Sequence, residues 1–472
     1  MGINKKGDYI VEKAENKLPG LLLNSYGFAY MTFNLMMSLA LNYYAIFITD
    51  VALITAAHMG TIMLITHFVD FASIPFSGSI IQKTQFRWGQ FRSWLFIPPI
   101  FTAIFFTLTF TNLPVSYGVK VVYLSLAYMI AHVNLNFAFN AHLGLISVVA
   151  KDVKERLRMS TRNMQWGMFS QIVFSCVVVK YMLYYFSEQS STWGYFYTVG
   201  ILAIVQVLGY WFLFYQTRNY EKYDPAKKLK SAFDLSFKEM LMQVISNKHL
   251  RLIMIADIAV NLGIFSLSTF APYYFKYITG NEQFMFQYTF ILGIGVFVST
   301  LVAPKVVKIL GKKKTYLFAG IWGTIGYCSL RIFGASDPWA YSFIVLASVL
   351  GAGTSYPIRQ AMYMDAAEYG YYKTGKDASA FIMSMYTLPT KIAIMLATSG
   401  AGYGLALIGF KANVVQSPEV LNNMMHIICF IPAGSCFMAF LLMLFYSLKD
   451  DRLAEIMEAN AIKKAETAGA NA

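Results

Sequence analysis

Two charged side chains lie deep inside apolar stretches of the sequence, where ionised groups are rare. Asp70 lies in the middle of the apolar segment 59–81, and Lys391 lies inside the segment 378–408. An ionised group at bilayer depth costs about 2.5 kcal/mol or more, so it usually faces a partner or a water-filled cavity. Neutralising the acid would free the lysine, so the pair could couple ion binding to solute binding. The alternative is a static ion pair that only joins two helices.

The neighbours of Asp70 extend this candidate ion site. His67, Asp70 and Ser73 are three residues apart and share one face of a helix. We predict that these three residues, together with Lys391, couple a proton or another cation to transport across the membrane. If the ion is sodium, Asp70 is its ligand, and we predict no other metal site.

Further polar residues inside apolar segments could contact a solute. Asn136 and Asn140 are four residues apart on one helical face, and Asn34 lies in the first apolar segment. Amides both donate and accept hydrogen bonds, which suits sugar hydroxyls, although they could equally join two helices. Arg162 could bind solute hydroxyls or a carboxylate, or extend to the cytoplasmic surface. Four other charges are interpreted as lying near span ends or in packing pairs: Lys180, Asp257, Lys276 and Arg331.

Composition predicts the element that positions these residues, the membrane-spanning helix. Of 472 residues, 57% are hydrophobic and only 13% are charged, which is too little charge to cover a soluble protein of this length. Segments of about 20 apolar residues cross a bilayer. We predict twelve, at 22–48, 59–81, 93–111, 119–149, 163–186, 194–216, 251–276, 284–307, 315–333, 339–364, 378–408 and 421–447.

The connections between these segments alternate in charge. Five of them, at 82–92, 150–162, 218–251, 304–314 and 359–376, hold 24 Lys or Arg residues, whereas the alternate connections hold only Lys120 and Lys411. Basic connections stay on the cytoplasmic side. We therefore expect a multi-pass protein of the cell inner membrane, surrounded by lipid, with both termini in the cytoplasm. The net charge of +14 is spread over these connections, so no nucleic-acid partner is expected.

The longest connection divides the chain into two halves. We predict an N-terminal six-helix bundle over 1–217, a cytoplasmic linker over 218–250, a C-terminal six-helix bundle over 251–448 and a cytoplasmic tail over 449–472. A short repeat supports two equivalent halves, because Tyr43-Tyr44 with Ile48-Thr49 recurs 230 residues later as Tyr273-Tyr274 with Ile278-Thr279. The fold class is therefore an all-α membrane protein. Part of the linker, 233–241, is amphipathic and is expected on the membrane surface.

Motifs of soluble enzymes are absent from the sequence. There is no phosphate-binding loop with its Lys-Ser/Thr, and no histidine cluster has zinc-ligand spacing. The four cysteines lie in apolar segments and form no pair with metal-ligand spacing. We expect neither an enzyme nor a cofactor.

Four stretches resemble one family of carriers. They are Asn42–Asp50, Asp70 with Pro75, the loop Arg87–Arg92, and Asp365–Gly370 with Lys391 following twenty-two residues after Tyr369. Over about residues 20–450 the chain is similar to the glycoside–pentoside–hexuronide:cation symporters of the major facilitator fold. The resemblance implies twelve transmembrane helices in two six-helix bundles, with a sugar bound between them and access that alternates between the two sides.

The resemblance also implies roles for individual residues. It assigns Asp70 to the cation site, with Lys391 beside it. It assigns to the sugar site Asn34, Arg162, Tyr386 and Thr387. The family's sugar-binding acid in the fourth helix falls at Phe137 or, with a shift of one residue, at Asn136, which we favour.

The chain departs from the family pattern in ways that affect the ion and the solute. Where the family has a second acid in its second helix, this chain has Ile74. The family's neighbouring amide is replaced by Ser73, and its preceding arginine by His67. Because hard cations need several oxygen ligands, these changes favour a proton over sodium; uncoupled diffusion is also open. The helix I acid is Asn34, so the cavity loses negative charge, which favours an anionic sugar such as a hexuronide.

A membrane sensor that uses the same fold without transport is the alternative function. The retained Asp70 and Lys391 favour transport. The expected partners are a small-molecule sugar or glycoside and a coupling cation, and the expected state is a monomer.

Overall fold

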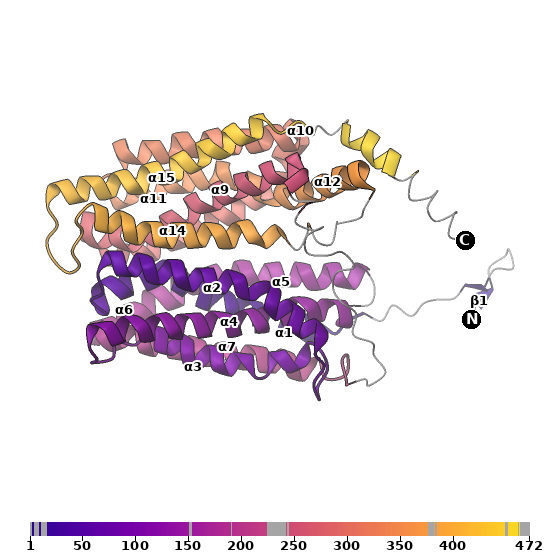
Figure 1. Cartoon of the computed structure of the whole chain (residues 1–472), viewed down its shortest axis with the longest axis horizontal. Helices are drawn as coiled ribbons and strands as arrows, with labels where there is room; N and C mark the ends of the chain where they lie inside the picture. Colours follow the sequence, from indigo (N-terminus) through magenta and orange to yellow (C-terminus); the bar gives the residue numbers. More distant parts are fainter. Residues whose placement is uncertain are drawn as a thin grey trace.

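The computed structural model is a bundle of long helices that run roughly parallel to one axis (Figure 1). It describes residues 2–3, 9–10, 17–150, 153–189, 191–223, 242, 245–375, 382, 385–448, 452–460 and 462. The first half contains α1 Gly20–Ile46, η1 Phe47–Val51, α2 Ala56–Lys83, η2 Arg92–Leu95, α3 Pro98–Thr109, α4 Tyr117–Val149, α5 Val153–Val173, η3 Phe174–Leu183, α6 Tyr184–Gln189 and α7 Ser191–Gln216. Before it, β1 Gly2–Ile3 pairs antiparallel with β2 Tyr9–Ile10.

The second half has the same helical character. It contains α9 Lys248–Tyr273, η4 Tyr274–Ile278, η5 Glu282–Phe284, α10 Met285–Phe333, α11 Pro338–Ala352, η6 Gly353–Ser355, α12 Tyr356–Thr374, η7 Met385–Thr387, α14 Leu388–Leu407 and α15 Pro418–Leu444. In Figure 1 these helices form one group, and the helices of the first half form another beside it. The amphipathic stretch predicted at 233–241 lies outside the described residues.

Among the described residues, eight helices are long and apolar enough to cross a membrane, and nine if a bent pair counts as one span. That pair consists of Glu282–Ser299 and Leu301–Phe333, which cover η5 and α10 and meet at an angle of 43°. The predicted helices 284–307 and 315–333 are both inside α10, which has a non-helical residue at Gly311 (φ 75°, ψ 165°). Only glycine adopts such a φ without strain. The multi-pass helical fold is confirmed, and the count of twelve stays a prediction.

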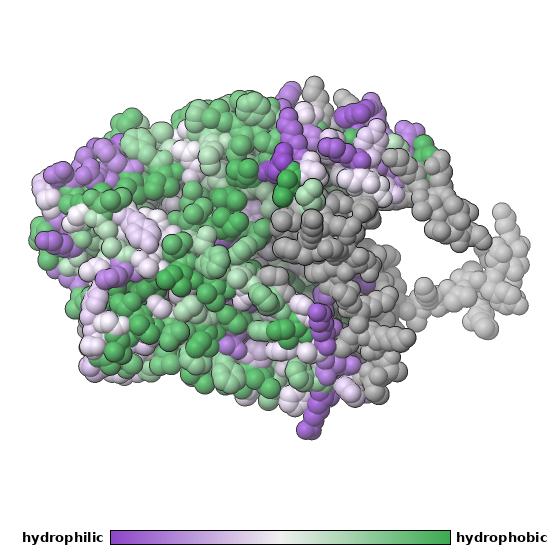
Figure 2. All heavy atoms as spheres, in the orientation of Figure 1, coloured by the Kyte–Doolittle hydropathy of each residue, from purple (hydrophilic) through white to green (hydrophobic). Residues whose placement is uncertain are grey.

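The outer surface of the bundle is apolar around its middle. Figure 2 shows hydrophobic residues over the central band and hydrophilic residues toward its two ends. Large apolar side chains of α2 and α7 are exposed, among them Phe68, Phe76, Ile204 and Leu208. An apolar belt of this kind fits lipid contact. We call the end that holds the connections 52–55, 334–337 and 409–417 the outer end and the opposite end the inner end; these names follow the orientation expected from the charge distribution.

Short polar caps start the helices at this outer end. Thr55 Oγ1 accepts a hydrogen bond from the His58 N–H at the start of α2. Asp337 and Ser417 cap α11 and α15, and in each case a proline follows at the first helical position. A side-chain cap followed by proline satisfies or removes N–H groups that lack helical partners. The outer connections can therefore be short.

Among the described residues, the helices that meet across the two halves include α1 with α9, α2 with α14, and α5 and η3 with α10. The α2–α14 crossing is the tightest, because a Cβ added to Gly402 would lie 2.4 Å from the Gly60 nitrogen and 2.5 Å from its Cα. Backbone atoms cannot move aside as a flexible side chain can. This crossing therefore requires glycine and brings the two halves into backbone contact.

Candidate functional site

The carboxylate of Asp70 and the ammonium of Lys391 meet between the two halves. Asp70 is on α2 and its side chain is 2% exposed, whereas Lys391 is on α14 and is 21% exposed. Their atoms Oδ2 and Nζ are 2.8 Å apart. The acid thus comes from the first half and the base from the second, and the contact joins residues 321 positions apart in sequence.

The amide of Asn136 on α4 donates hydrogen bonds to the other oxygens of the Asp70 site. Asn136 Nδ2 donates to Asp70 Oδ1 (2.7 Å), to Ser73 Oγ (2.8 Å) and to the Asp70 carbonyl oxygen (3.2 Å). Because a carboxylate and a carbonyl can only accept, these contacts require the NH₂ group on this side of the amide. We expected Asn136 in the sugar site; its amide in this structure is part of the Asp70 site.

Two buried histidines lie next to this site. His132 on α4 is 1% exposed, and its Nδ1 is 3.8 Å from Asp70 Oδ1. His67 on α2 is buried, with Nε2 3.4 Å from the hydroxyl of Tyr128. The His67 and His132 rings are 6.0 Å apart. Neither ring nitrogen of His132 has a hydrogen-bond partner in the described structure. Asp70 is thus surrounded by titratable groups from two helices.

The remaining predicted solute residues are spread over other parts of the interior. Asn34 donates to the Tyr30 carbonyl of its own helix (2.8 Å), and Asn140 donates to Ser77 Oγ (2.7 Å). Tyr386 packs edge-on against Tyr363, with ring centroids 5.3 Å apart. Thr387, at the start of α14, is exposed. No hydrogen bond of the described structure links these four residues to Asp70, so their solute roles stay predictions.

Arg162 lines a cavity of about 280 Å³ near the inner end of the first half. The cavity is formed by α1 and α5, and its lining residues are Leu23, Arg158, Thr161, Arg162 and Gln165. Two guanidinium groups one helical turn apart face the same space. Arg158 is already bound to Glu155, with Nη1 and Oε1 2.6 Å apart. Arg162 therefore offers the cavity a cation that could meet an anionic solute.

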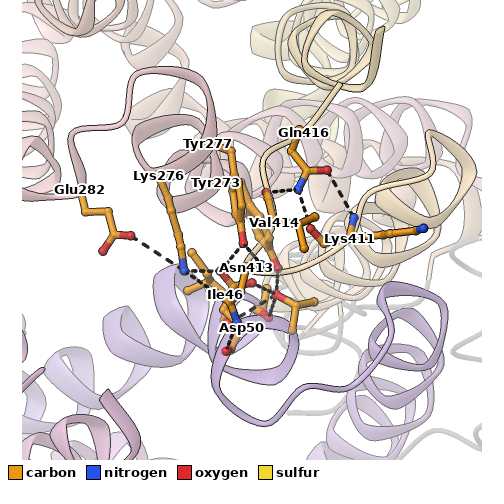
Figure 3. Close-up of polar contacts among 12 residues, drawn as sticks. Ile46, Asp50, Tyr273, Lys276, Tyr277, Glu282, Lys411, Asn413, Val414 and Gln416 are labelled. Atoms are coloured by element: carbon orange, nitrogen blue, oxygen red, sulfur yellow. Dashed lines mark hydrogen bonds and ion pairs between the residues drawn. The ribbon is translucent and has the colours of Figure 1, made fainter. Parts of the chain in front are cut away.

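A second polar cluster joins the two halves at their outer end (Figure 3). Asp50 Oδ2 accepts hydrogen bonds from Lys276 Nζ (2.5 Å) and from the Tyr277 hydroxyl (2.6 Å). Asn413 Nδ2 donates to the Asp50 carbonyl oxygen (2.7 Å). The Thr49 and Tyr273 hydroxyls are 2.9 Å apart. Lys276 was expected near a span end or in a packing pair, and its ammonium pairs with Asp50 across the two halves.

Comparison with known proteins identifies the family. The family model described as MFS/sugar transport protein matches residues 25–450. The chain belongs to this family. It is a membrane transporter of the major facilitator fold and not an enzyme, as predicted, and the resemblance to glycoside–pentoside–hexuronide:cation symporters is confirmed at the family level.

Two relatives and one solved structure are similar to this chain. A glucuronide carrier protein homolog of Escherichia coli (strain K12) is 27% identical, covering 88% of this chain and 89% of the relative. The isoprimeverose transporter of Lactiplantibacillus pentosus is 26% identical, covering 95% and 93%. The crystal structure of a D-xylose-proton symporter superposes with a TM-score of 0.63 at 14% identity, covering 91% of this chain and 97% of that one. This last likeness concerns the fold alone.

This transporter of the MFS/sugar transport family has further buried charges that stay within one half. Asp257 Oδ1 accepts from the Tyr316 hydroxyl (3.1 Å) and lies 3.6 Å from Arg359 Nη1. The Glu221 carboxylate accepts from the backbone N–H groups of residues 90, 91 and 92 at 2.9–3.1 Å. Asp257 was expected in a packing pair; the role of Glu221 was missed, since it lies in a charged connection where a solvated side chain is the ordinary expectation.

Proposed function

We propose that this chain imports a sugar or glycoside by proton symport, with preference for an anionic sugar such as a hexuronide. The observation that carries the proposal is the filling of the Asp70 site by N–H donors. Lys391 donates to one carboxylate oxygen of Asp70, and Asn136 donates both to the other carboxylate oxygen and to Ser73 Oγ. Sodium would need several of these oxygens as ligands. A proton needs only one of them.

Charge balance connects the proton to an anionic solute. The Asp70–Lys391 pair is neutral while Asp70 is ionised. A proton on Asp70 would remove its attraction for Lys391, leaving one uncompensated positive charge between the halves. A solute carboxylate could then bind Lys391, with Arg162 as a second cation nearer the inner end. One proton would thus move with one monoanion, without net charge transfer.

The histidines beside Asp70 support a proton rather than a metal ion. Imidazole side chains serve as proton shuttles in many proteins. His132 and His67 both lie beside the acid, on α4 and α2. Among the described residues there is no group of three or more His, Cys, Asp or Glu side chains that could hold a metal ion. The name of the glucuronide carrier homolog agrees with an acidic sugar as substrate.

The test is uptake into proteoliposomes in sodium-free buffer. A glucuronide and the glucoside with the same aglycone are compared under an acid-outside pH gradient, with the membrane potential clamped or imposed. We expect accumulation of the glucuronide that a protonophore abolishes and that an imposed potential leaves unchanged. Uptake that requires sodium, or that a protonophore does not reduce, would refute proton symport. Equal uptake of both glycosides would refute the preference for an anion.

Variants separate coupling from simple loss of a buried acid. Asp70→Asn should abolish accumulation but retain exchange of labelled for unlabelled solute. Asp257→Asn is the matched control, since Asp257 is also 2% exposed and ion-paired but lies within one half. The control should accumulate solute under the same gradient. If Asp70→Asn accumulates solute as well as the unmodified chain does, Asp70 has no coupling role.

A further inference from the structure

The polar cluster at the outer end connects the two halves at one spot, and we call it the outer lock: Thr49, Asp50, Tyr273, Lys276, Tyr277 and Asn413. Thr49 and Asp50 belong to the first half, and the other four to the second. In Figure 3 the side chains of Lys276, Tyr277 and Asn413 converge on Asp50. Every acceptor atom of Asp50 is used, since Oδ1 accepts from Thr49 Oγ1 at 2.7 Å.

The bonds of the outer lock support one another across the interface. Lys276 Nζ donates to Asn413 Oδ1 (3.0 Å) as well as to Asp50. The Asn413 backbone N–H donates to the Tyr277 hydroxyl (2.9 Å). Asn413 has φ 56°, a left-handed conformation that asparagine tolerates better than most residues. The turn after α14 is thereby shaped to bring this amide to the first half.

Burial makes the outer lock costly to open. The Asp50 side chain is 3% exposed and that of Lys276 is 24% exposed. Separating the halves at this end breaks the Lys276, Tyr277 and Asn413 bonds to Asp50 together, since all three donors belong to the second half. Charge-assisted bonds of this kind are stronger than neutral ones. The halves therefore have a strong tie at their outer end.

Asp50 and Lys276 lie in matching helix ends of the two halves. α1 and α9 each end in a π-helical turn, Phe47–Val51 and Tyr274–Ile278. These turns overlap the two copies of the 230-residue repeat, which places Lys276 four residues before the counterpart of Asp50, and α1 packs against α9. The repeated helix ends face each other, one with an acid and the other with a lysine. The complementary charges let equivalent ends attract each other.

Two ion pairs nearer the inner end each join residues of the same half. Arg158 pairs with Glu155, and Lys312 pairs with Asp365 at 2.5 Å. The cavity that contains Arg162 also lies toward this end. Two ion pairs join the halves in the described structure, one at the outer end and one between Asp70 and Lys391. This arrangement corresponds to a carrier that is closed on its outer side.

We propose that the Asp50–Lys276 contact is the outer gate of the transport cycle. It must break for solute to enter from outside, and its strength sets the ratio of outward-open to outward-closed molecules. This inference rests on the proposed carrier function for its role, but not on the coupling ion or on the nature of the solute. Neither Lys276 nor Asp50 contacts Asp70, so their role is to hold the two halves in position.

The experiment measures the distance across the outer end of the full-length protein, without substrate or gradient. Cys176, Cys328, Cys429 and Cys436 are first replaced. Spin labels are placed at Val115 and Val415, which lie in outer connections of different halves and are 39% and 100% exposed. Pulsed electron resonance then gives the populations of short and long distances. In the unmodified background we expect the short distance to dominate.

Lys276→Met should raise the ratio of long to short distances by roughly tenfold or more, the factor for loss of one hydrogen bond to a charged group. The exchanged pair Asp50→Lys with Lys276→Asp should return most of the short population. Lys411→Met is the matched control, because this lysine is exposed in the same connection as Asn413 and its ammonium points away from Asp50 in Figure 3. It should leave the ratio unchanged.

An unchanged ratio in Lys276→Met would overturn the gate, as would a shift of equal size in Lys411→Met. Lys276 is partly exposed, so its variant is expected to fold even if changes at the buried Asp50 do not. Because no solute or ion gradient is present, the distances do not depend on the coupling ion. Failure of proton symport and failure of the gate therefore produce different results.

Discussion

Replacing Lys391 with methionine would leave Asp70 as a buried acid without its counter-charge. Removing one partner of a buried ion pair costs about 3–5 kcal/mol. Asp70 is 2% exposed but keeps the 2.7 Å bond from Asn136, so we expect the lower end, about 3 kcal/mol. Asp70→Asn should cost less, about 1–2 kcal/mol, since Lys391 is 21% exposed and can reach water. The double variant should lose little more than Asp70→Asn alone.

The assay is a double-mutant cycle on the free energy of unfolding, measured by denaturant titration of the purified protein in one detergent at one pH. We expect a coupling energy of about 2–3 kcal/mol between the two positions. Lys411→Met serves as the control for loss of an exposed lysine. If the double variant is destabilised by the sum of the single effects to within about 0.5 kcal/mol, the two charges do not stabilise each other and the contact has no energetic meaning.

Two other predictions concern glycine packing and a buried carboxylate. Gly402→Leu should prevent the close approach of α14 to Gly60, which should destabilise the closed outer end by about 1–3 kcal/mol and reduce uptake. Gly400→Leu is the control and should transport normally, because a Cβ at Gly400 meets open space. Glu221→Ala should remove the acceptor of three backbone N–H groups and lower the unfolding free energy by about 2 kcal/mol or more. Lys222→Ala changes an exposed neighbour and should leave the unfolding free energy unchanged. If both variants lose the same unfolding free energy, the role of Glu221 is contradicted.

Much of the fold could be predicted because membrane helices leave a strong signal in sequence. Each span must satisfy its backbone hydrogen bonds internally, so apolar length alone locates it, and the alternation of Lys and Arg gives the expected orientation. Boundaries were less certain. The helices predicted at 284–307 and 315–333 are continuous except at Gly311, since a glycine with positive φ can redirect a helix without a long connecting loop.

The contact between Asp70 and Lys391 could be anticipated because charges deep in a span are few and each needs a partner. The Asp50–Lys276 contact was missed for the opposite reason. Charged side chains near span ends can reach water or lipid headgroups, so they do not need an oppositely charged partner. A signal was nevertheless present, since the 230-residue repeat sets the end of α1 against the end of α9. Asn136 shows a further limit, because an amide suits a sugar and a carboxylate equally well.

The Asp50–Lys276 and Asp70–Lys391 ion pairs have the same polarity, with the acid in the first half and the lysine in the second. Gly60 and Gly402 cross on the outer side of Asp70, about 15 Å along α2 from it. Opening the outer end must therefore separate Asp50 from Lys276 and α2 from α14 at this crossing. A proton on Asp70 would weaken the inner of the two ionic ties while leaving the outer one intact. The proton alone would then not open the protein to the outside, and the outer lock would limit how often the empty carrier does so.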